Sequence, residues 1–297
     1  MANQLRFLDP EILSKISGME LRARTVVEGF ISGLHRSPYR GFSSEFAEYR
    51  EYTPGDDVRF IDWKMFARSD RFYVKQFEEE TNLGCMILLD VSASMEYAGD
   101  SVSKIEYASY VAASLGYLIF RQRDGVGLML FDQEIKRYIP ARNKKGHLLS
   151  VLQSLEDLET GQETDLSLPL HQIAERLNKK GMIILISDLL DDPESVVRGL
   201  QHFRFKGHDV ILFHIMDETE ISFPFKNATK FIDMEGSAQF VAIPSLVRET
   251  YLQNLNAHLD TFKKECSRLK IDYHILNTAK PIDFALFSYL AYRSGKG

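Results

Sequence analysis

Five short apolar runs separated by helical stretches constrain the fold of this chain more than any other feature of its sequence. The runs lie at 85–91, 126–131, 182–187, 209–215 and 271–276, and two of them are nearly free of polar residues. Strands that are buried on both faces have this composition, which a parallel sheet covered by helices requires. The alternation predicts an α/β fold with a doubly wound, mainly parallel, Rossmann-like sheet flanked by helices.

The stretches between and beside these runs predict the remaining elements. Helical spacing is present at about 102–122, 144–157, 167–179 and 191–204. Gln133-Glu134 indicates a tight hairpin that adds one short antiparallel edge strand. Two β-like pieces between about 217 and 244 predict an inserted β-hairpin, after which Ser245 is expected to cap a helix that ends near Arg268.

The first 82 residues lack this regularity. Helical spacing at 10–35 is interrupted at Gly18, and Arg71–Phe77 alternates as a strand does. We therefore predict two parts, namely a mixed helical and β accessory segment at 1–82 and an α/β domain with its inserted hairpin at 83–297.

Polar side chains follow the ends of two predicted strands. Asp90, Ser92 and Ser94 come directly after the first run, and Asp188 follows the run 182–187. Thr164 lies in a polar loop before the helix that leads into that second strand. Ligands bind beyond the carboxyl ends of the strands in a doubly wound sheet, so these five residues are expected to meet. Their oxygens suit Mg²⁺ or Mn²⁺.

The kinds of ligand predict how such a metal would act. If Ser92 and Ser94 bind the ion directly, these ligands are neutral, and Asp90 and Asp188 act partly through water. The cation then keeps much of its positive charge and an open coordination position. An acidic side chain of another protein would bind there, so the sequence predicts a metal-dependent latch.

Composition excludes several classes of protein. The formal net charge of the 297 residues is −6, which gives no electrostatic footprint for nucleic acid, and the basic run Arg142–Lys145 is interpreted as a solvated loop. The chain has two cysteines, which are too few for a disulfide framework and fit a reducing compartment. The longest weakly polar segment, 108–120, is too short to span a bilayer, and the first residues do not resemble a signal peptide. We expect a soluble, cytoplasmic protein without a membrane span.

Two motifs together resemble a known family. Asp90-x-Ser92-x-Ser94 with Thr164 and Asp188 resembles the metal-ion-dependent adhesion site of von Willebrand factor type A domains. The upstream segment Tyr49-Arg-Glu-Tyr-Thr-Pro-Gly-Asp-Asp-Val-Arg-Phe-Ile-Asp-Trp-Lys64 is similar to the signature of the bacterial family called domain of unknown function fifty-eight. The two motifs occur here in the order in which that family has them.

The resemblance implies a von Willebrand factor type A-like domain in a non-enzymatic, partner-binding protein. It also implies work beside a MoxR-type AAA+ ATPase, in a chaperone-like or complex-assembly role. Many relatives carry membrane segments near the N-terminus, and we do not transfer that attachment to this chain.

Three alternatives stay open from the sequence. The Asp-Ser-Ser turn could merely cap the next helix. The site could be that of a metal-dependent phosphatase-like hydrolase, although such enzymes need a second Asp where this chain has Ser92. The domain could also be a scaffold in which the metal is purely structural.

Overall fold

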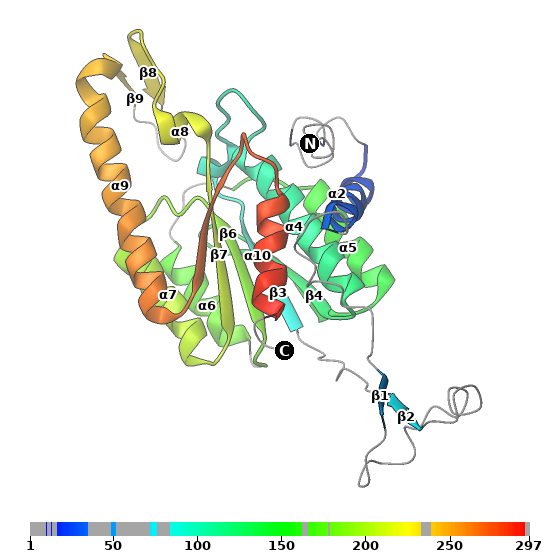
Figure 1. The fold of residues 1–297 in the computed structure, drawn as a ribbon. Coiled ribbons are helices and arrows are strands. Elements are labelled where there is room, and N and C mark those ends of the chain that lie inside the picture. Colours follow the sequence, from blue (N-terminus) through cyan, green and yellow to red (C-terminus); the bar gives the residue numbers. More distant parts are fainter. Residues whose placement is uncertain are drawn as a thin grey trace.

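The computed structural model describes residues 10, 13, 17–34, 49–51, 72–75, 84–161, 166–177, 179–232 and 239–294. Six strands form one sheet in the order β10-β7-β6-β3-β4-β5 (Figure 1). They are β3 (Gly84–Asp90), β4 (Gly125–Phe131), β5 (Ile135–Arg142), β6 (Met182–Ser187), β7 (Asp209–Met216) and β10 (Asp272–Asn277). All neighbouring strands are parallel except β4 and β5. The predicted doubly wound, mainly parallel sheet is confirmed.

Helices cover both faces of this sheet, and each face has its own hydrophobic core (Figure 1). The first core includes α2 (Met19–Leu34), α4 (Lys104–Arg121), α5 (Lys145–Glu156) and α10 (Asp283–Ser294). The second includes α6 (Ser167–Arg176), α7 (Pro193–Phe205) and α9 (Pro244–Leu269). In β3, Ile87 and Leu89 enter the first core while Met86 and Leu88 enter the second. This two-sided burial explains why the strand is apolar at almost every position.

The order of the strands places a switch point at the centre of the sheet. From β3 the chain crosses through α4 to β4 on one side, and it later returns through α6 to β6 on the other side of β3. The carboxyl ends of β3 and β6 therefore lie side by side, with Leu89 opposite Ile186. Loops diverge above such a point and leave room for a ligand.

In the N-terminal part the structure describes one helix and two short strands. Helix α2 begins directly after Gly18, whose φ of 82° ends the preceding turn in a conformation that glycine adopts without strain. Strands β1 (Tyr49–Glu51) and β2 (Tyr73–Lys75) pair antiparallel, the second within the predicted strand 71–77. Most of the family signature, at 52–71, lies outside the described residues, and the boundary at 82–83 stays a prediction.

The predicted inserted hairpin is present after a short helix α8 (Glu218–Ser222). Strand β8 (Thr229–Ile232) pairs antiparallel with β9 (Gln239–Ala242). Phe223 anchors the hairpin to α9, because its ring lies 5.8 Å from that of Phe231 and 4.7 Å from that of Tyr251. In Figure 1 this hairpin stands beyond the carboxyl ends of the strands.

Two details of the prediction were wrong. Helix α9 begins at Pro244 with Ile243 at the capping position and no side-chain cap, so Ser245 lies inside the first turn. Proline at the first helical position replaces the cap, because its missing N–H would have had no partner there. The hairpin after β4 also gives an edge strand of 8 residues rather than a short one.

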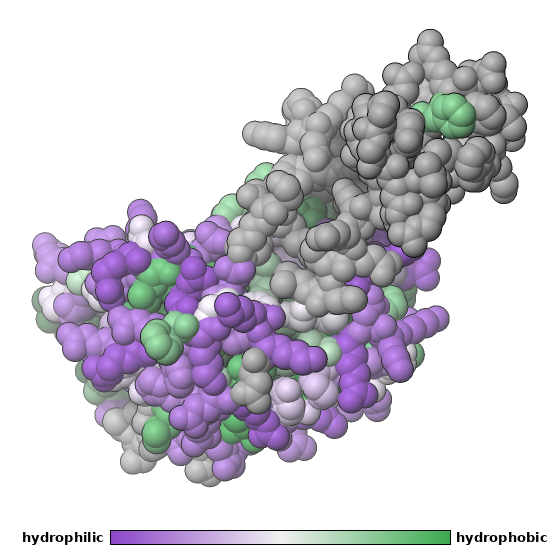
Figure 2. Space-filling view, turned by 90° about the horizontal axis from the view of Figure 1, so that it is seen from below, coloured by the Kyte–Doolittle hydropathy of each residue, from purple (hydrophilic) through white to green (hydrophobic). Residues whose placement is uncertain are grey.

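The surface at the opposite edge of the sheet, seen from below in Figure 2, is mainly hydrophilic with small separate hydrophobic patches. Among the described residues, no helix has the length and apolar character that crossing a membrane requires.

Gly127 in β4 tests the packing between β4 and β5. A Cβ at this position would lie 2.7 Å from Met86 Cε and 2.8 Å from two backbone atoms of β5. We expect Gly127→Ala to lower the free energy of unfolding by about 1–3 kcal/mol, since backbone must move to admit the methyl group. Gly146→Ala in α5 is the control, because its Cβ meets nothing within 4 Å. Chemical denaturation should show no loss for the control, and equal effects of the two changes would contradict this packing.

Candidate functional site

Four of the five predicted site residues lie at the carboxyl ends of β3 and β6. Asp90 is the last residue of β3, and the chain then turns into a short 3₁₀ helix, η3 (Ala93–Glu96), that begins after Ser92 and includes Ser94. Asp188 follows the last residue of β6. The two carboxylates and the two hydroxyls are all buried.

Hydrogen bonds hold the first of these loops in one shape. Asp90 Oδ1 accepts from the backbone N–H of Ser92 at 3.0 Å, and Asp90 Oδ2 accepts from the hydroxyl of Ser187 at 2.6 Å. The Oγ atoms of Ser92 and Ser94 lie 3.1 Å apart. Ser92 makes no side-chain cap of the following turn, so the alternative of a simple capping role has no support in the structure.

Thr164 lies outside the described residues, but both ends of the segment that carries it are attached to the site loops. The N–H of Gly161 donates to the carbonyl of Val91 at 2.7 Å. The N–H of Leu166 donates to Asp191 Oδ2 at 2.8 Å. Val91 lies between two predicted ligands and Asp191 follows a third, so residues 161 and 166 are fixed beside the predicted site.

A buried lysine occupies the other side of the second carboxylate. Lys104 Nζ lies 2.7 Å from Asp188 Oδ2 and 3.0 Å from Glu220 Oε1, and its side chain is 1% exposed. Burial alone would lower the pKa of Lys104, but Asp188 and Glu220 outweigh it and raise the pKa. The ammonium therefore stays charged and joins α4, the turn after β6, and α8.

Lys104 was not among the predicted site residues, although its position in the sequence is informative. Lys104 is the first residue of α4, where the positive end of the helix dipole disfavours a cation. A lysine there indicates that carboxylates lie nearby. Glu220 gave no such signal, because it belongs to an acidic helix start, which is ordinary in sequence.

The two site carboxylates affect each other. Burial and, to a smaller extent, the charge of Asp188 raise the pKa of Asp90 to about 7, although the hydrogen bonds from Ser187 and Ser92 oppose them. His214 stands behind the second carboxylate and hydrogen-bonds to the backbone of Asp188, and burial lowers its pKa to about 3. Asp90 therefore loses its proton only near neutral pH, and an uncharged imidazole lies behind Asp188.

A second network ties the surrounding loops together. The buried carboxylate of Asp217 accepts from the N–H of Gly99 at 3.2 Å and from the hydroxyl of Thr278 at 2.9 Å. It also accepts from the N–H and the hydroxyl of Thr219, at 2.8 and 2.6 Å. Three loops at the carboxyl edge therefore meet on one side chain, which fixes the walls around the candidate site.

The donor set fits a small divalent cation. Octahedral Mg²⁺ holds oxygens at about 2.0–2.1 Å, so two neighbouring ligands lie roughly 2.9 Å apart, close to the 3.1 Å between the Ser92 and Ser94 hydroxyls. Lys104 holds Asp188 Oδ2 at 2.7 Å, whereas Oδ1 accepts only a long hydrogen bond of 3.4 Å from Leu190 N–H, so Oδ1 is the oxygen more open to such an ion. Among the described residues no group of three or more His, Cys, Asp or Glu side chains could hold a metal, so this site depends on hydroxyl oxygens.

Removing one carboxylate should change how stability depends on pH. Folded Asp90 keeps its proton up to about pH 7, whereas an unfolded aspartate loses it near 3.8. The folded state then binds more protons in this window, so stability should fall as pH rises from 4 to 7. In the presence of a chelator, the free energy of unfolding of the wild type should fall by on the order of a few kcal/mol between pH 4 and 7. The Asp90→Asn variant should not show this fall. Parallel denaturation curves for both proteins would refute the burial argument.

The lysine bridge should be essential for the fold. Lys104→Met leaves Asp188 buried without its cation, and we expect a loss of about 3–5 kcal/mol in the free energy of unfolding. Arg268→Met is the matched control, because Arg268 and its partner Glu265 are partly exposed, at 57% and 26%, and such a pair contributes less than about 1 kcal/mol. Urea denaturation distinguishes the two, and a small effect at Lys104 would contradict the bridge.

Comparison with known proteins gives matches over most of the chain. The family model described as "Protein of unknown function DUF58" matches residues 48–260. The uncharacterized protein Rv1480 of Mycobacterium tuberculosis (strain ATCC 25618 / H37Rv) is 25% identical over 254 residues, which cover 84% of this chain and 80% of that protein. The uncharacterized protein YeaD of Bacillus subtilis (strain 168) is 27% identical over 113 residues, which cover 38% of this chain and 26% of that protein.

Two solved structures are also similar. The conserved hypothetical protein BatB from Bacteroides thetaiotaomicron is 18% identical, with a TM-score of 0.49 over 72% of this chain and 100% of that chain. The VWA domain of SpRpn10 is 12% identical, with a TM-score of 0.41 over 69% of this chain and 94% of that chain.

Proposed function

We propose that this chain, which belongs to the DUF58 family, is a non-enzymatic protein-interaction module that binds an acidic side chain of its partner through Mg²⁺ or Mn²⁺. The ion would be held by Ser92 and Ser94, with Asp90, Asp188 and Thr164 completing the set. The partner would be a MoxR-type AAA+ ATPase or a client of it, a role that rests on the family resemblance alone.

One observation carries the metal-dependent part of this proposal. Two neutral hydroxyls lie 3.1 Å apart beside two buried carboxylates at the switch point of the sheet. Neutral ligands leave a divalent cation with much of its charge, and Lys104 already neutralises one oxygen of Asp188. When bound, the cation supplies a Lewis-acidic position to which an incoming carboxylate can attach.

The surroundings of Asp90 disfavour the phosphatase-like alternative. Both oxygens of Asp90 accept hydrogen bonds that fix its carboxylate in place, one from Ser92 N–H and one from the Ser187 hydroxyl. Ser92 also stands where such enzymes need an acid–base carboxylate. We therefore propose a binding role rather than catalysis.

The scaffold alternative predicts metal binding without an effect on partners. An ion that binds only the folded state raises stability by mass action whatever its role, by about 2.7 kcal/mol at a hundredfold excess over Kd. Stability alone cannot distinguish the two ideas, so partner binding must be measured separately.

The test combines metal titration with partner binding. We expect Mg²⁺ or Mn²⁺ to raise the unfolding temperature of the wild-type protein, and we expect Ser92→Ala with Ser94→Ala to abolish this shift. Asp260→Asn, which removes an exposed carboxylate on α9, is the control and should respond as the wild type does.

Partner binding should be measured at constant Mg²⁺, because a AAA+ ATPase needs Mg²⁺ for its own nucleotide. The wild type and Asp260→Asn should bind a surface-immobilised MoxR-type ATPase with equal affinity. The double serine variant should bind it at least about tenfold more weakly. If the double variant still binds the ATPase although Mg²⁺ or Mn²⁺ no longer raises its unfolding temperature, the scaffold alternative is supported. Hydrolysis of phosphate esters that disappears in Asp90→Ala would refute the non-enzymatic proposal.

A further inference from the structure

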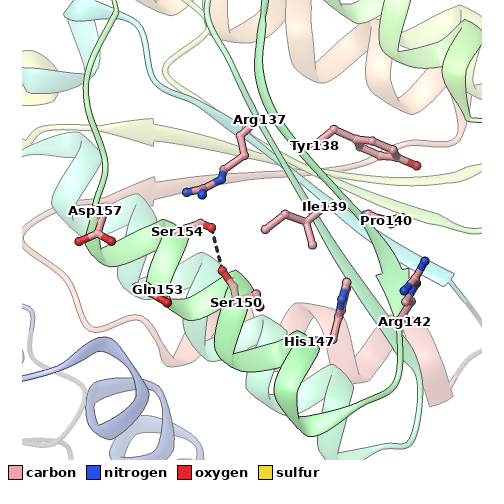
Figure 3. Close-up of a pocket in the computed structure, with 10 residues that line it drawn as sticks. All are labelled: Arg137, Tyr138, Ile139, Pro140, Arg142, His147, Ser150, Gln153, Ser154 and Asp157. Carbon is pink, nitrogen blue, oxygen red and sulfur yellow. Dashed lines mark hydrogen bonds between the residues drawn. The ribbon is translucent and has the colours of Figure 1, made fainter.

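A groove with a volume of about 510 Å³ runs between the edge strand β5 and helix α5 (Figure 3). Arg137, Ile139 and Arg142 line it from the strand, and His147, Ser150 and Ser154 line it from the helix. Figure 3 shows Arg137 directed toward the last turns of α5 and Arg142 beside His147 near the start of that helix.

The outer edge of β5 is open within the described part of the chain. Strand β5 pairs with β4 on one side and with no other described strand. None of its residues is buried, in contrast to β3 and β4, which are buried at six of seven positions. The outward N–H and C=O groups of such an edge are available to a further strand.

An irregularity in β5 brings both arginines to the same groove. Arg137 and Arg142 are five positions apart, so regular alternation would direct them to opposite faces. The pairing with β4 shifts between Val126 and Leu128, where Ile139 and Arg142 are their partners. This bulge changes the phase of the strand, and it contains Pro140, which such a position tolerates because no ladder hydrogen bond is lost. A second register shift lies between Leu130 and Phe131, whose partners are Arg137 and Ile135, and the pairing is regular from Arg137 to Ile139.

The groove carries positive charge on a chain whose formal net charge is −6. Arg137 and Arg142 are exposed, and neither forms an ion pair with any residue that the structure describes. Lys144 and Lys145 follow directly, while Asp157 is the one acidic side chain among those lining the groove. His147 Nε2 is buried and has no hydrogen-bond partner among the described atoms. Charge and an unpaired nitrogen thus both indicate a missing anionic group.

We propose that this groove binds an extended, acidic segment of a partner protein, which adds to the sheet as a strand along β5. Main-chain hydrogen bonds to 135–139 would provide affinity, and carboxylates of the segment would meet Arg137 and Arg142. At about 3.4 Å per residue these arginines are roughly 17 Å apart, so two acidic residues on one face of a regular segment should meet them when they are four or six positions apart.

Charges on an edge strand also prevent edge-to-edge aggregation, and a solvated basic loop would explain Lys144 and Lys145. Neither role needs a groove against a helix, and neither leaves a buried imidazole nitrogen without a partner. The acidic segment accounts for all three features at once.

This surface goes beyond the metal-dependent function and is independent of it. The groove contains none of the proposed metal ligands, and its strand leads away from the carboxyl edge after Ile135. A partner could engage both surfaces, but the loss of one should leave the other intact. The test is therefore made in EDTA as well as in Mg²⁺.

The probe is a fluorescein-labelled ten-residue peptide that alternates Val or Thr with Glu, compared with a peptide of equal charge that has Pro at every Val and Thr position. Fluorescence anisotropy with the full chain should show binding of the first peptide, unchanged by EDTA. The proline peptide lacks every second main-chain N–H, and its rings fix φ near −65° and so disfavour a strand, so it should bind at least about tenfold more weakly.

Two variants separate the groove from the general charge of the protein. Arg137→Glu with Arg142→Glu should weaken peptide binding by at least about tenfold, whereas Arg198→Glu with Arg268→Glu on the other face should change it by less than about twofold. Both pairs are exposed, so thermal unfolding should confirm that each variant is folded. In the wild type, the peptide should slow hydrogen exchange of the β5 amides.

Four results would overturn the proposal. Equal binding of the proline peptide would mean that charge alone attracts it. Equal weakening by the two double variants would mean that the groove is not the site. Absence of protection in β5 would mean that no strand is added. Loss of peptide binding in EDTA would also count against it, because the groove would then depend on the metal.

Discussion

Two carboxylates buried beside each other, Asp90 and Asp188, are the constraint on which the rest of the site depends. Asp90 ends β3 and Asp188 directly follows β6, and the residues of both strands are almost all buried. Hydrogen bonds from Ser92 and Ser187 stabilise the first, and the ammonium of Lys104 stabilises the second. Because Lys104 also reaches Glu220, the charge balance of the site is tied to α8, from which the hairpin β8–β9 continues. One negative charge remains that a cation can balance.

This balance explains why the site stands where it does. The switch point between β3 and β6 is the place where loops diverge, so polar groups can gather there without breaking the ladder of the sheet. Asp217 and Asp191 then fasten the neighbouring loops by accepting backbone N–H groups. The groove at β5 differs from this site in both position and charge. It lies at the edge of the same sheet, where unpaired backbone and excess positive charge coincide.

The fold could be predicted from the sequence because local patterns, namely apolar runs and helical spacing, indicate most of its elements. All five apolar runs became strands; burial on both faces explains the composition of β3, β4, β6 and β7, whereas β10 lies at the edge of the sheet and keeps polar residues. Asp90, Ser92, Ser94 and Asp188 could be assigned to one edge because topology brings strand ends together. Lys104 and Glu220 were missed, since their contacts join residues 116 positions apart and no local pattern records such a pair. The start of α9 lies two residues earlier than predicted, because Ile243 rather than Ser245 occupies the capping position and Pro244 is the first helical residue.

The central claim is that a divalent cation binds between the hydroxyls of Ser92 and Ser94. Anomalous scattering from a crystal grown with Mn²⁺ tests it most directly, because the anomalous signal of the ion shows where it is bound. We expect one peak within about 2.3 Å of both Oγ atoms, with Asp188 reached directly or through one water. A peak elsewhere, or none at saturating Mn²⁺, would contradict the claim.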